Sequence, residues 1–333
     1  MPTQIEEIAA VSAAEFAARI RERARPLVLR GQNAGWPAVR IARESPVALF
    51  ESLRQLDGAQ ALSTMIAPPE IRGRFFYTQS MDGVNFERRP QTLGESIDQI
   101  LAYAGTPRAP TVYVGAVPLG PRARFAAENR AGLLDATVTP RIWLSNAATV
   151  QTHLDMSENL ACVVCGTRRF TLFPPEAIGD LYVGPLDFTL AGQPVSLVRL
   201  DDPDFERYPR FERALEVACY ADLEPGDALY IPYMWWHHVE MRGPLNVLVN
   251  YWWNNATAWK GSPFDCLVHA IAGLRALPAP ERAAWHAVFS HYIFNEEDAT
   301  AHIPSASRGV LAPLDANNAE QIRQWLLRSL ARG

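Results

Sequence analysis

Two histidines and an aspartate have the residue types and the spacing to hold a transition metal. His153 and Asp155 are separated by one residue, and on a β-strand residues i and i+2 point to the same face. An imidazole and a carboxylate would therefore point at one place. A second histidine is available in the pair His237-His238. Two imidazoles and one carboxylate on one face of an octahedron are typical of non-haem iron(II) oxygenases, in which the remaining metal positions stay open to reactants.

The elements that must position these side chains are short strands. Because an H-x-D pattern also arises by chance, its surroundings matter. The sequence predicts a strand at residues 160–164, a tight turn at Gly166 and a strand at 169–173 that stops at two prolines. Residues 223–232 predict a turn and a strand that lead directly to the histidine pair. Residues 246–253 predict a further strand that lies beside that strand.

The wider pattern divides the chain into three regions. Residues 1–109 mix helices and strands, residues 110–258 alternate short apolar runs with turns, and residues 259–333 return to helical periodicity. Many short strands at regular spacing predict an all-β sandwich or barrel in the middle region. We expect helices at 12–24, 46–56, 91–104, 264–276, 279–294 and 317–331, and strands that include 25–31, 73–77, 111–114, 141–144 and 228–231.

Composition and charge limit the classes of partner. The 333 residues carry a formal net charge of −5, which gives no general attraction to nucleic acid or to anionic membranes. The N-terminus lacks the basic start and apolar core of a signal peptide, and no apolar stretch is long enough to span a membrane. We therefore expect a cytoplasmic protein that has no membrane partner and no evident nucleic-acid partner.

The four cysteines are not spaced as a disulfide framework. Cys162 and Cys165 have the spacing of a redox or zinc motif. They lie in an apolar run that predicts a strand, on which residues i and i+3 point to opposite faces. This arrangement favours buried structural thiols.

Four motifs occur along the chain in a fixed order. They are the H-x-D-x3-N pattern of His153–Asn159, the run Gly166–Pro175, the run Pro225–His238 and the tripeptide 250–252. In this order they resemble the JmjC-related, cupin-8-like family of Fe(II)- and 2-oxoglutarate-dependent oxygenases, and within it the asparaginyl hydroxylases. The resemblance covers residues 25–255 and is densest from 141 to 253. It implies a mainly β fold with a double-stranded β-helix (jelly-roll or cupin) core, flanked by a helical N-terminal part and a helical C-terminal tail.

The resemblance also implies roles for single residues. His153, Asp155 and His237 match the family's catalytic iron ligands, which leaves His238 as a structural residue. Aromatic side chains at this density are usually core, so we expect most of Trp143, Trp235, Trp236, Trp252 and Trp253 to lie in the barrel core. The positions that match co-substrate contacts or the wall beside the iron are Arg168, Asn159, Asn250, Tyr113 and Trp252.

Arg168 stands where the family often has a lysine that binds the distal carboxylate of 2-oxoglutarate. A guanidinium can bind a carboxylate through two parallel hydrogen bonds. A salt bridge at the rim of the barrel is the alternative for Arg168, and we expect Arg169 to face the other way along the strand. Val150 stands where many relatives have a threonine, so we expect no threonine hydroxyl at this position of the pocket.

The implied activity is hydroxylation of a prime substrate with Fe(II), 2-oxoglutarate as co-substrate and dioxygen. We favour an amino-acid side chain in a protein or peptide as the prime substrate, with a small molecule as the alternative. Two other functions remain open: a cupin metalloenzyme that acts on a small molecule without 2-oxoglutarate, and a non-catalytic cupin binding module. The helical tail either folds back on its own barrel or pairs with a second copy, and the resemblance implies a homodimer through these helices.

Overall fold

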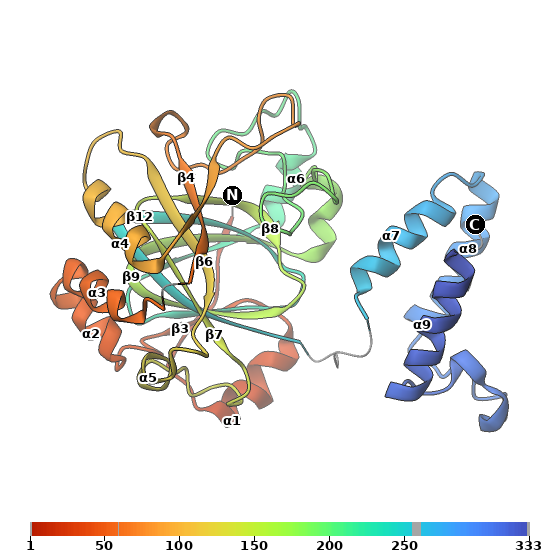
Figure 1. The fold of residues 1–333 in the computed structure, drawn as a ribbon. Helices are drawn as coiled ribbons and strands as arrows, with labels where there is room; N and C mark the ends of the chain where they lie inside the picture. Colours follow the sequence, from red (N-terminus) through yellow and green to blue (C-terminus); the bar gives the residue numbers. More distant parts are fainter. Residues whose placement is uncertain (1, 59, 255–260, 332–333) are drawn as a thin grey trace. The chain divides into compact units, whose positions relative to one another are not determined.

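The computed structural model describes the chain except for residues 1, 59, 255–260 and 332–333. The chain divides into two compact units, Met1–Trp253 and Asn254–Gly333. Figure 1 shows the first as a large sheet with helices packed on it and the second as a group of helices. The elements before residue 110 belong to the first unit and contribute strands to its sheet.

The first unit is built on a mixed sheet of twelve strands, as the sequence predicts for a mainly β fold. The central path runs β2-β3-β11-β9-β12-β7-β6-β4-β5, with β1, β10 and β8 attached beside it, and it does not close on itself. The strands are β1 (Thr3–Gln4), β2 (Glu7–Ala9), β3 (Leu27–Arg30), β4 (Leu62–Ala67), β5 (Glu87–Gln91), β6 (Thr111–Pro118), β7 (Pro140–Ser145), β8 (Thr149–Leu154), β9 (Glu158–Phe173), β10 (Cys219–Leu223), β11 (Ala228–Ile231) and β12 (Trp236–Trp253).

Strands β9 and β12 are long and antiparallel, and they form the centre of the sheet. The predicted turn at Gly166 is wrong, because β9 continues through it. The strand predicted at 246–253 begins earlier than expected, because β12 already starts at Trp236 and includes the histidine pair. Gly166 has a φ of +73°, and a Cβ there would lie 2.4 Å from the side-chain oxygen of Asn246. The left-handed glycine and the register shift between Arg242 and Val247 bend the pair without ending it.

Helices cover one face of the sheet and leave the other face to the candidate site. Alternation along β6 places Val112 and Val114 in the core under the helices, while Tyr113 lines a cavity on the opposite face. The helices of this unit are α1 (Ala13–Glu15), which continues as π and 3-10 turns to Arg23, α2 (Pro37–Glu44), α3 (Pro46–Leu53), α4 (Leu93–Tyr103), α5 (Ala123–Glu128) and α6 (Phe211–Val217). The helices predicted at 12–24, 46–56 and 91–104 are thereby confirmed.

Two local predictions are wrong. Residues 73–77 do not form a strand but make isolated bridges, Arg74 with Thr149 and Tyr77 with Val84, because Gly73 adopts a φ of +76° against the backbone of residues 147–148. Cys162 and Cys165 are buried free thiols, as predicted, yet both lie in the same core cluster. A register shift on the paired strand β12, between Val247 and Leu248, accounts for this loss of alternation.

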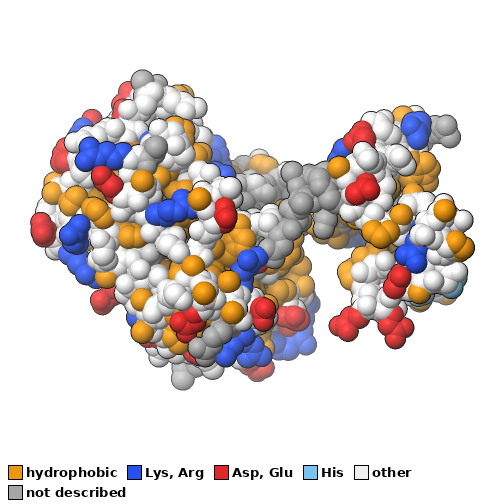
Figure 2. Space-filling model, turned by 90° about the horizontal axis from the view of Figure 1, so that it is seen from below, with side chains coloured by type: hydrophobic (Ala, Val, Ile, Leu, Met, Phe, Trp, Pro, Cys, Tyr) orange, Lys and Arg blue, Asp and Glu red, His pale blue; other side chains and the backbone are white. Residues whose placement is uncertain are grey.

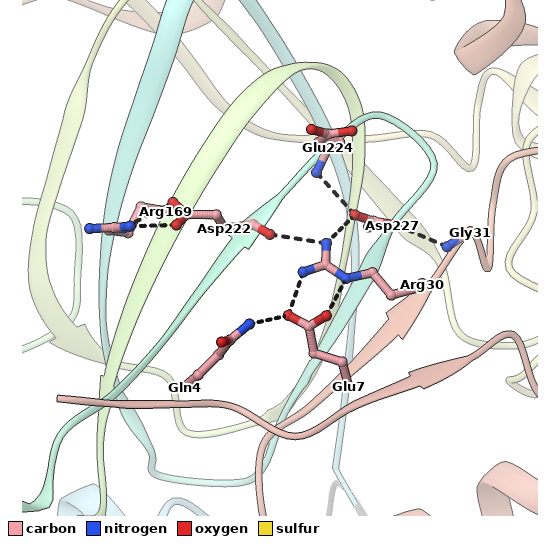
Figure 3. A network of polar contacts seen from close by, with 8 residues as sticks. All are labelled: Gln4, Glu7, Arg30, Gly31, Arg169, Asp222, Glu224 and Asp227. Carbon is pink, nitrogen blue, oxygen red and sulfur yellow. Dashed lines mark hydrogen bonds and ion pairs between the residues drawn. The ribbon is translucent and has the colours of Figure 1, made fainter.

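Arg30 on β3 ties the N-terminal strands to the turn before β11 (Figure 3). Its Nε donates to Glu7 Oε2 at 2.9 Å, and its Nη1 donates to the backbone carbonyl of Asp222 at 3.0 Å and to Asp227 Oδ2 at 2.5 Å. Asp227 Oδ1 also accepts the backbone N–H of Gly31 at 2.9 Å. The network therefore fixes the start of the segment that carries β11 and β12.

Replacing Arg30 by methionine should lower the free energy of unfolding by about 1.5–3 kcal/mol, because buried Asp227 loses its charged hydrogen-bond partner. Urea denaturation of the full chain measures the change. Arg124→Met breaks only an exposed ion pair with Glu128 on one helix and should change stability by less than about 0.5 kcal/mol. Equal losses in the two variants would show that the Arg30 network adds nothing beyond a surface pair.

The second unit consists of helices with unburied apolar side chains. Its long helices are α7 (Pro263–Leu274), α8 (Ala279–Phe289), which continues as a π turn to Phe294, and α9 (Ala316–Leu330), so the three predicted helices are confirmed. Figure 2 shows hydrophobic side chains on their outer surface. Within the described part of the chain, no helix has the length and apolarity that a bilayer crossing requires. The exposed large hydrophobic side chains here are Leu267, Val268, Trp285, Val288, Tyr292, Ile293, Phe294, Val310, Leu314, Trp325, Leu326, Leu327 and Leu330.

Candidate metal centre

The structure brings together the three side chains that the sequence singles out. His153 lies on β8 and is the cross-strand partner of His237 on β12, and Asp155 follows directly after β8. One ligand atom from each residue lies within 4.8 Å of the others. The two imidazole ring centroids are 4.1 Å apart, and His237 Nε2 lies 3.6 Å from Asp155 Oδ2. The i, i+2 argument for a shared face is therefore confirmed.

Backbone contacts set the tautomers of both histidines. His153 Nδ1 lies 2.8 Å from the carbonyl of Gln151, and His237 Nδ1 lies 3.2 Å from the carbonyl of Trp235. A carbonyl can only accept, so each Nδ1 carries a hydrogen, and Nε2 is the ring nitrogen left to face a metal. Burial and the neighbouring His153 lower the pKa of His237 to about 4. His237 is therefore neutral at pH 7, the form in which imidazole binds metal.

His238 points away from this centre, as predicted. Its Nδ1 lies 3.3 Å from the hydroxyl of Thr152 on β8. Burial lowers the pKa of His238 to about 3. The alternation of neighbouring strand residues thus separates a candidate ligand from a buried structural histidine.

A chain of hydrogen bonds between side chains ends on Asp155. Trp252 Nε1 donates to Asp155 Oδ2 at 2.9 Å, and Asn159 Nδ2 lies 3.5 Å from the same oxygen. Asn250 Nδ2 donates to Asn159 Oδ1 at 3.2 Å, and Trp143 Nε1 donates to Asn250 Oδ1 at 2.7 Å. These contacts hold the carboxylate in one orientation, which is how supporting residues tune a metal ligand.

The tryptophans divide between the core and the site. Trp252 and Trp143 line the cavity, with ring centroids 5.5 Å apart. Sequence reasoning expected most of the five tryptophans in the core and missed the bond from Trp143 to Asn250. Residue type and spacing carry no signal for this contact, which becomes visible only when β7 and β12 are known to pair. Of the five tryptophans considered, only Trp236 is fully buried, while Trp143, Trp235 and Trp253 are half-buried against the core clusters.

The three candidate ligands open into a cavity of about 480 Å³ that also contains Arg168. This arginine is 2% exposed, and its Nε and Nη2 have no hydrogen-bond partner among the described residues. Burial lowers the pKa of Arg168 to about 10, so the guanidinium remains charged at pH 7. A buried charge without a partner is costly unless a ligand supplies one. The alternative of a rim salt bridge for Arg168 is therefore wrong.

The neighbouring side chains separate as the strand geometry predicts. Arg169 faces outward and pairs with Asp222, with Nε 2.9 Å from Oδ1. Tyr113 is buried beside the cavity, and burial raises the pKa of its hydroxyl, which is therefore protonated at pH 7 and can donate a hydrogen bond. Val150 lines the cavity without a hydroxyl to offer.

These residues fit an iron(II) ion and an anionic co-substrate. Two imidazoles and one carboxylate are the donor set that non-haem iron(II) favours, and three ligands leave positions open. The unpaired donors of Arg168 suit a carboxylate, which accepts two parallel hydrogen bonds from a guanidinium. The cavity therefore has a place for a metal and a place for an anion.

Comparison with known proteins agrees with this geometry. Residues 13–258 match the family described as a cupin-like domain. The chain is 38% identical over 114 residues to Lysine-specific demethylase JMJ31 of Arabidopsis thaliana, which covers 34% of this chain. It is 36% identical over 107 residues to tRNA wybutosine-synthesizing protein 5 of Gallus gallus, covering 32% of this chain. It is 25% identical over 254 residues to Jumonji C domain-containing protein 5 of Drosophila melanogaster, covering 75% of this chain.

The matched segments are parts of these relatives. They cover 20%, 30% and 59% of the three proteins' own lengths. The chain therefore spans less than two thirds of each relative. The names of the relatives also differ in substrate, a lysine in one case and a tRNA in another, so the similarity identifies the domain and leaves the substrate open.

Proposed function

Because this chain belongs to the cupin-like, JmjC-related domain family, we propose that it is an Fe(II)- and 2-oxoglutarate-dependent oxygenase that hydroxylates an amino-acid side chain in a protein or peptide. The observation that carries the proposal is the combination within one cavity of a His-Asp-His cluster and a buried guanidinium whose Nε and Nη2 have no partner among the described residues. A metal site alone would suit many cupin enzymes. The additional cation suits a dicarboxylic co-substrate.

In this proposal His153, Asp155 and His237 hold the iron, and Arg168 binds the distal carboxylate of 2-oxoglutarate. The hydroxyl of Tyr113 stays protonated and is available to donate to the same carboxylate. When bound, the iron, 2-oxoglutarate and dioxygen supply the oxidising chemistry. The protein's part is to position these groups and to exclude competing reactions.

The chain's own residues prepare the site for this role. Trp252 and Asn159 hold Asp155 in place, so the ligand set needs little rearrangement to accept a metal. Apolar side chains form the surrounding wall and limit the access of water to the reacting groups. The cavity-lining members of this wall include Val150, Ala161, Phe170, Val239 and Leu248.

The direct test is conversion of 2-oxoglutarate to succinate by the purified chain. We expect turnover with ferrous iron and none with the metal chelated. Mass spectrometry of a cell lysate treated with the protein, iron and 2-oxoglutarate should then reveal peptides heavier by one oxygen atom. A chain that binds iron but leaves 2-oxoglutarate unchanged under all these conditions would contradict the proposal and favour a cupin enzyme of another kind.

We also propose that the second unit forms a homodimer through its helices. Of its described residues, only Thr300 and Ala319 are buried. Trp285 and Tyr292 are 45% and 51% exposed, and aromatic side chains of this kind are enriched at interfaces. A two-fold pairing of helices would bury them, and such dimers are the commonest oligomers.

Light scattering should give twice the chain mass of 37.0 kDa at micromolar concentration. Trp285→Glu should shift the protein toward the monomer, since it places a charge in the proposed interface, whereas Glu281→Gln on the same helix should leave the dimer intact. We expect the monomeric variant to lose more activity on a large substrate than in uncoupled 2-oxoglutarate turnover. A monomer of the unmodified chain throughout this concentration range would disprove the dimer.

A further inference from the structure

The cavity contains one exposed cation in addition to the residues of the proposed oxygenase site. Arg88 lies on β5 opposite Met65 of β4, and both side chains line the cavity. Because Arg88 is exposed, it lies at the open side of the cavity, whereas Arg168 is buried. The next arginine, Arg89, points away from the cavity and pairs with Glu87, with Nε 2.9 Å from Oε2.

The charge of Arg88 is not neutralised by the part of the chain that the structure describes. Its Nη2 donates to the backbone carbonyl of Leu190, and its guanidinium carbon lies 5.4 Å from the ring centroid of Phe86. Among the described residues, no carboxylate forms an ion pair with Arg88. The guanidinium has five N–H donors, so the bond to Leu190 leaves others for an acidic group outside the chain.

The described lining of the cavity offers a positively charged ligand no carboxylate other than the proposed metal ligand. Among the described residues that line it, Asp155 is the only acidic one, and this carboxylate is the proposed metal ligand. A cationic side chain entering the cavity would meet Arg88 and would find no free carboxylate inside. Burying a charge without a partner is costly. Much of the lining is apolar, and one buried cluster contributes Met65, Phe75, Phe86, Leu190, Val195 and Met241 to it.

From these observations, and resting on the function proposed above, we propose that the prime substrate is a peptide segment of defined character. It places an uncharged, mainly apolar side chain in the cavity and an acidic residue beside it against Arg88. Lysine-like side chains are excluded, in contrast to the substrate class that the name of the Arabidopsis relative states for that protein. A peptide fits better than an RNA because the net charge of −5 disfavours binding to a polyanion.

Binding of four capped pentapeptides tests this inference. Their central residue is leucine or lysine, and their flanking residues are glutamate or lysine. Affinity is measured by quenching of tryptophan fluorescence, since Trp143 and Trp252 line the cavity. The protein carries iron(II) and 2-oxoglutarate under dioxygen-free conditions, so no turnover occurs. We expect the leucine peptide with glutamate flanks to bind most tightly. Its affinity should fall by about three- to tenfold in Arg88→Gln, a loss between those typical of an exposed ion pair and of a charge-assisted hydrogen bond.

Matched variants separate the charge of Arg88 from its contact with the loop that contains Leu190. Arg89→Gln removes a charge from the same strand on the other face and should leave affinity unchanged. Tyr77→Phe removes another bond to that loop, from the Tyr77 hydroxyl to the carbonyl of Phe188 at 2.7 Å, without changing any charge. It should preserve the preference for glutamate flanks. Arg88→Glu should reverse the preference toward lysine flanks.

Three outcomes of the binding comparisons would overturn the inference. They are equal or tighter binding of lysine-centred peptides, an unchanged flank preference in Arg88→Gln and Arg88→Glu, and tighter binding of a single-stranded RNA oligonucleotide than of any peptide. Absence of peptide binding by a chain that does convert 2-oxoglutarate would also overturn it. Failure of the proposed oxygenase function would appear separately, as absence of succinate formation by the unmodified chain.

Discussion

Asp155→Ala and His153→Ala should each reduce 2-oxoglutarate turnover by more than about 100-fold, because even the residues that support a metal ligand contribute about 10- to 100-fold to affinity or activity. Each substitution removes one of three protein ligands from a site with no fourth in reach: among the described residues, the metal-binding cluster contains only His153, Asp155 and His237. Succinate release and bound iron, measured on the same samples, report the loss.

The control for this prediction is His238→Asn. His238 is adjacent to His237 on β12 but contacts Thr152 on the other side of the strand. Its replacement should leave turnover close to that of the unmodified chain when rates are compared per folded molecule. Circular dichroism establishes the folded fraction of every variant. Full turnover by Asp155→Ala, or equal losses in Asp155→Ala and His238→Asn, would show that the cluster is not the metal site.

The sequence alone was enough to locate the candidate ligands because their geometry is local. His153 and Asp155 share a face through strand alternation, and the mainly β fold with its helical flanks follows from the spacing of short apolar runs. His237 could be separated from His238 only through the family resemblance. The paired register of β8 and β12 now supplies the physical reason, since it sets His237 directly opposite His153.

The contacts that support the site could not be predicted because they depend on strand order. The bond from Trp143 to Asn250 joins residues 107 positions apart, and nothing in either residue type points to the other. The sequence does not single out Arg88 either, since its importance comes from its place at the cavity and from the lack of an ion pair with any carboxylate among the described residues. The continuity of β9 through Gly166 was missed for a different reason: a left-handed glycine is typical of a turn, and only the close approach of Asn246 shows that it serves a bend.

Arg168→Ala should raise the apparent KM for 2-oxoglutarate by about 10- to 150-fold, the equivalent of about 1.5–3 kcal/mol for hydrogen bonds to a charged group. Iron affinity should change far less, because Arg168 is not part of the metal cluster. Arg168→Lys should keep part of the affinity, since it retains the charge but loses the two parallel hydrogen bonds. Arg169→Ala, on the outward face and paired with Asp222, is the matched control.

A second measurement distinguishes a ligand-binding arginine from a structural one. In the protein without 2-oxoglutarate, Arg168 is a buried charge whose Nε and Nη2 have no partner among the described residues. Replacing Arg168 with methionine, which has a similar length, should therefore not lower the free energy of unfolding. It should raise the free energy of unfolding if the methionine side chain packs well. Added 2-oxoglutarate should then stabilise the unmodified chain against urea far more than it stabilises Arg168→Met. A ligand stabilises the folded state in proportion to how tightly it binds, and the variant should bind 2-oxoglutarate weakly. Equal stabilisation of the two proteins, together with an unchanged KM, would assign the distal carboxylate to another cation such as Arg141.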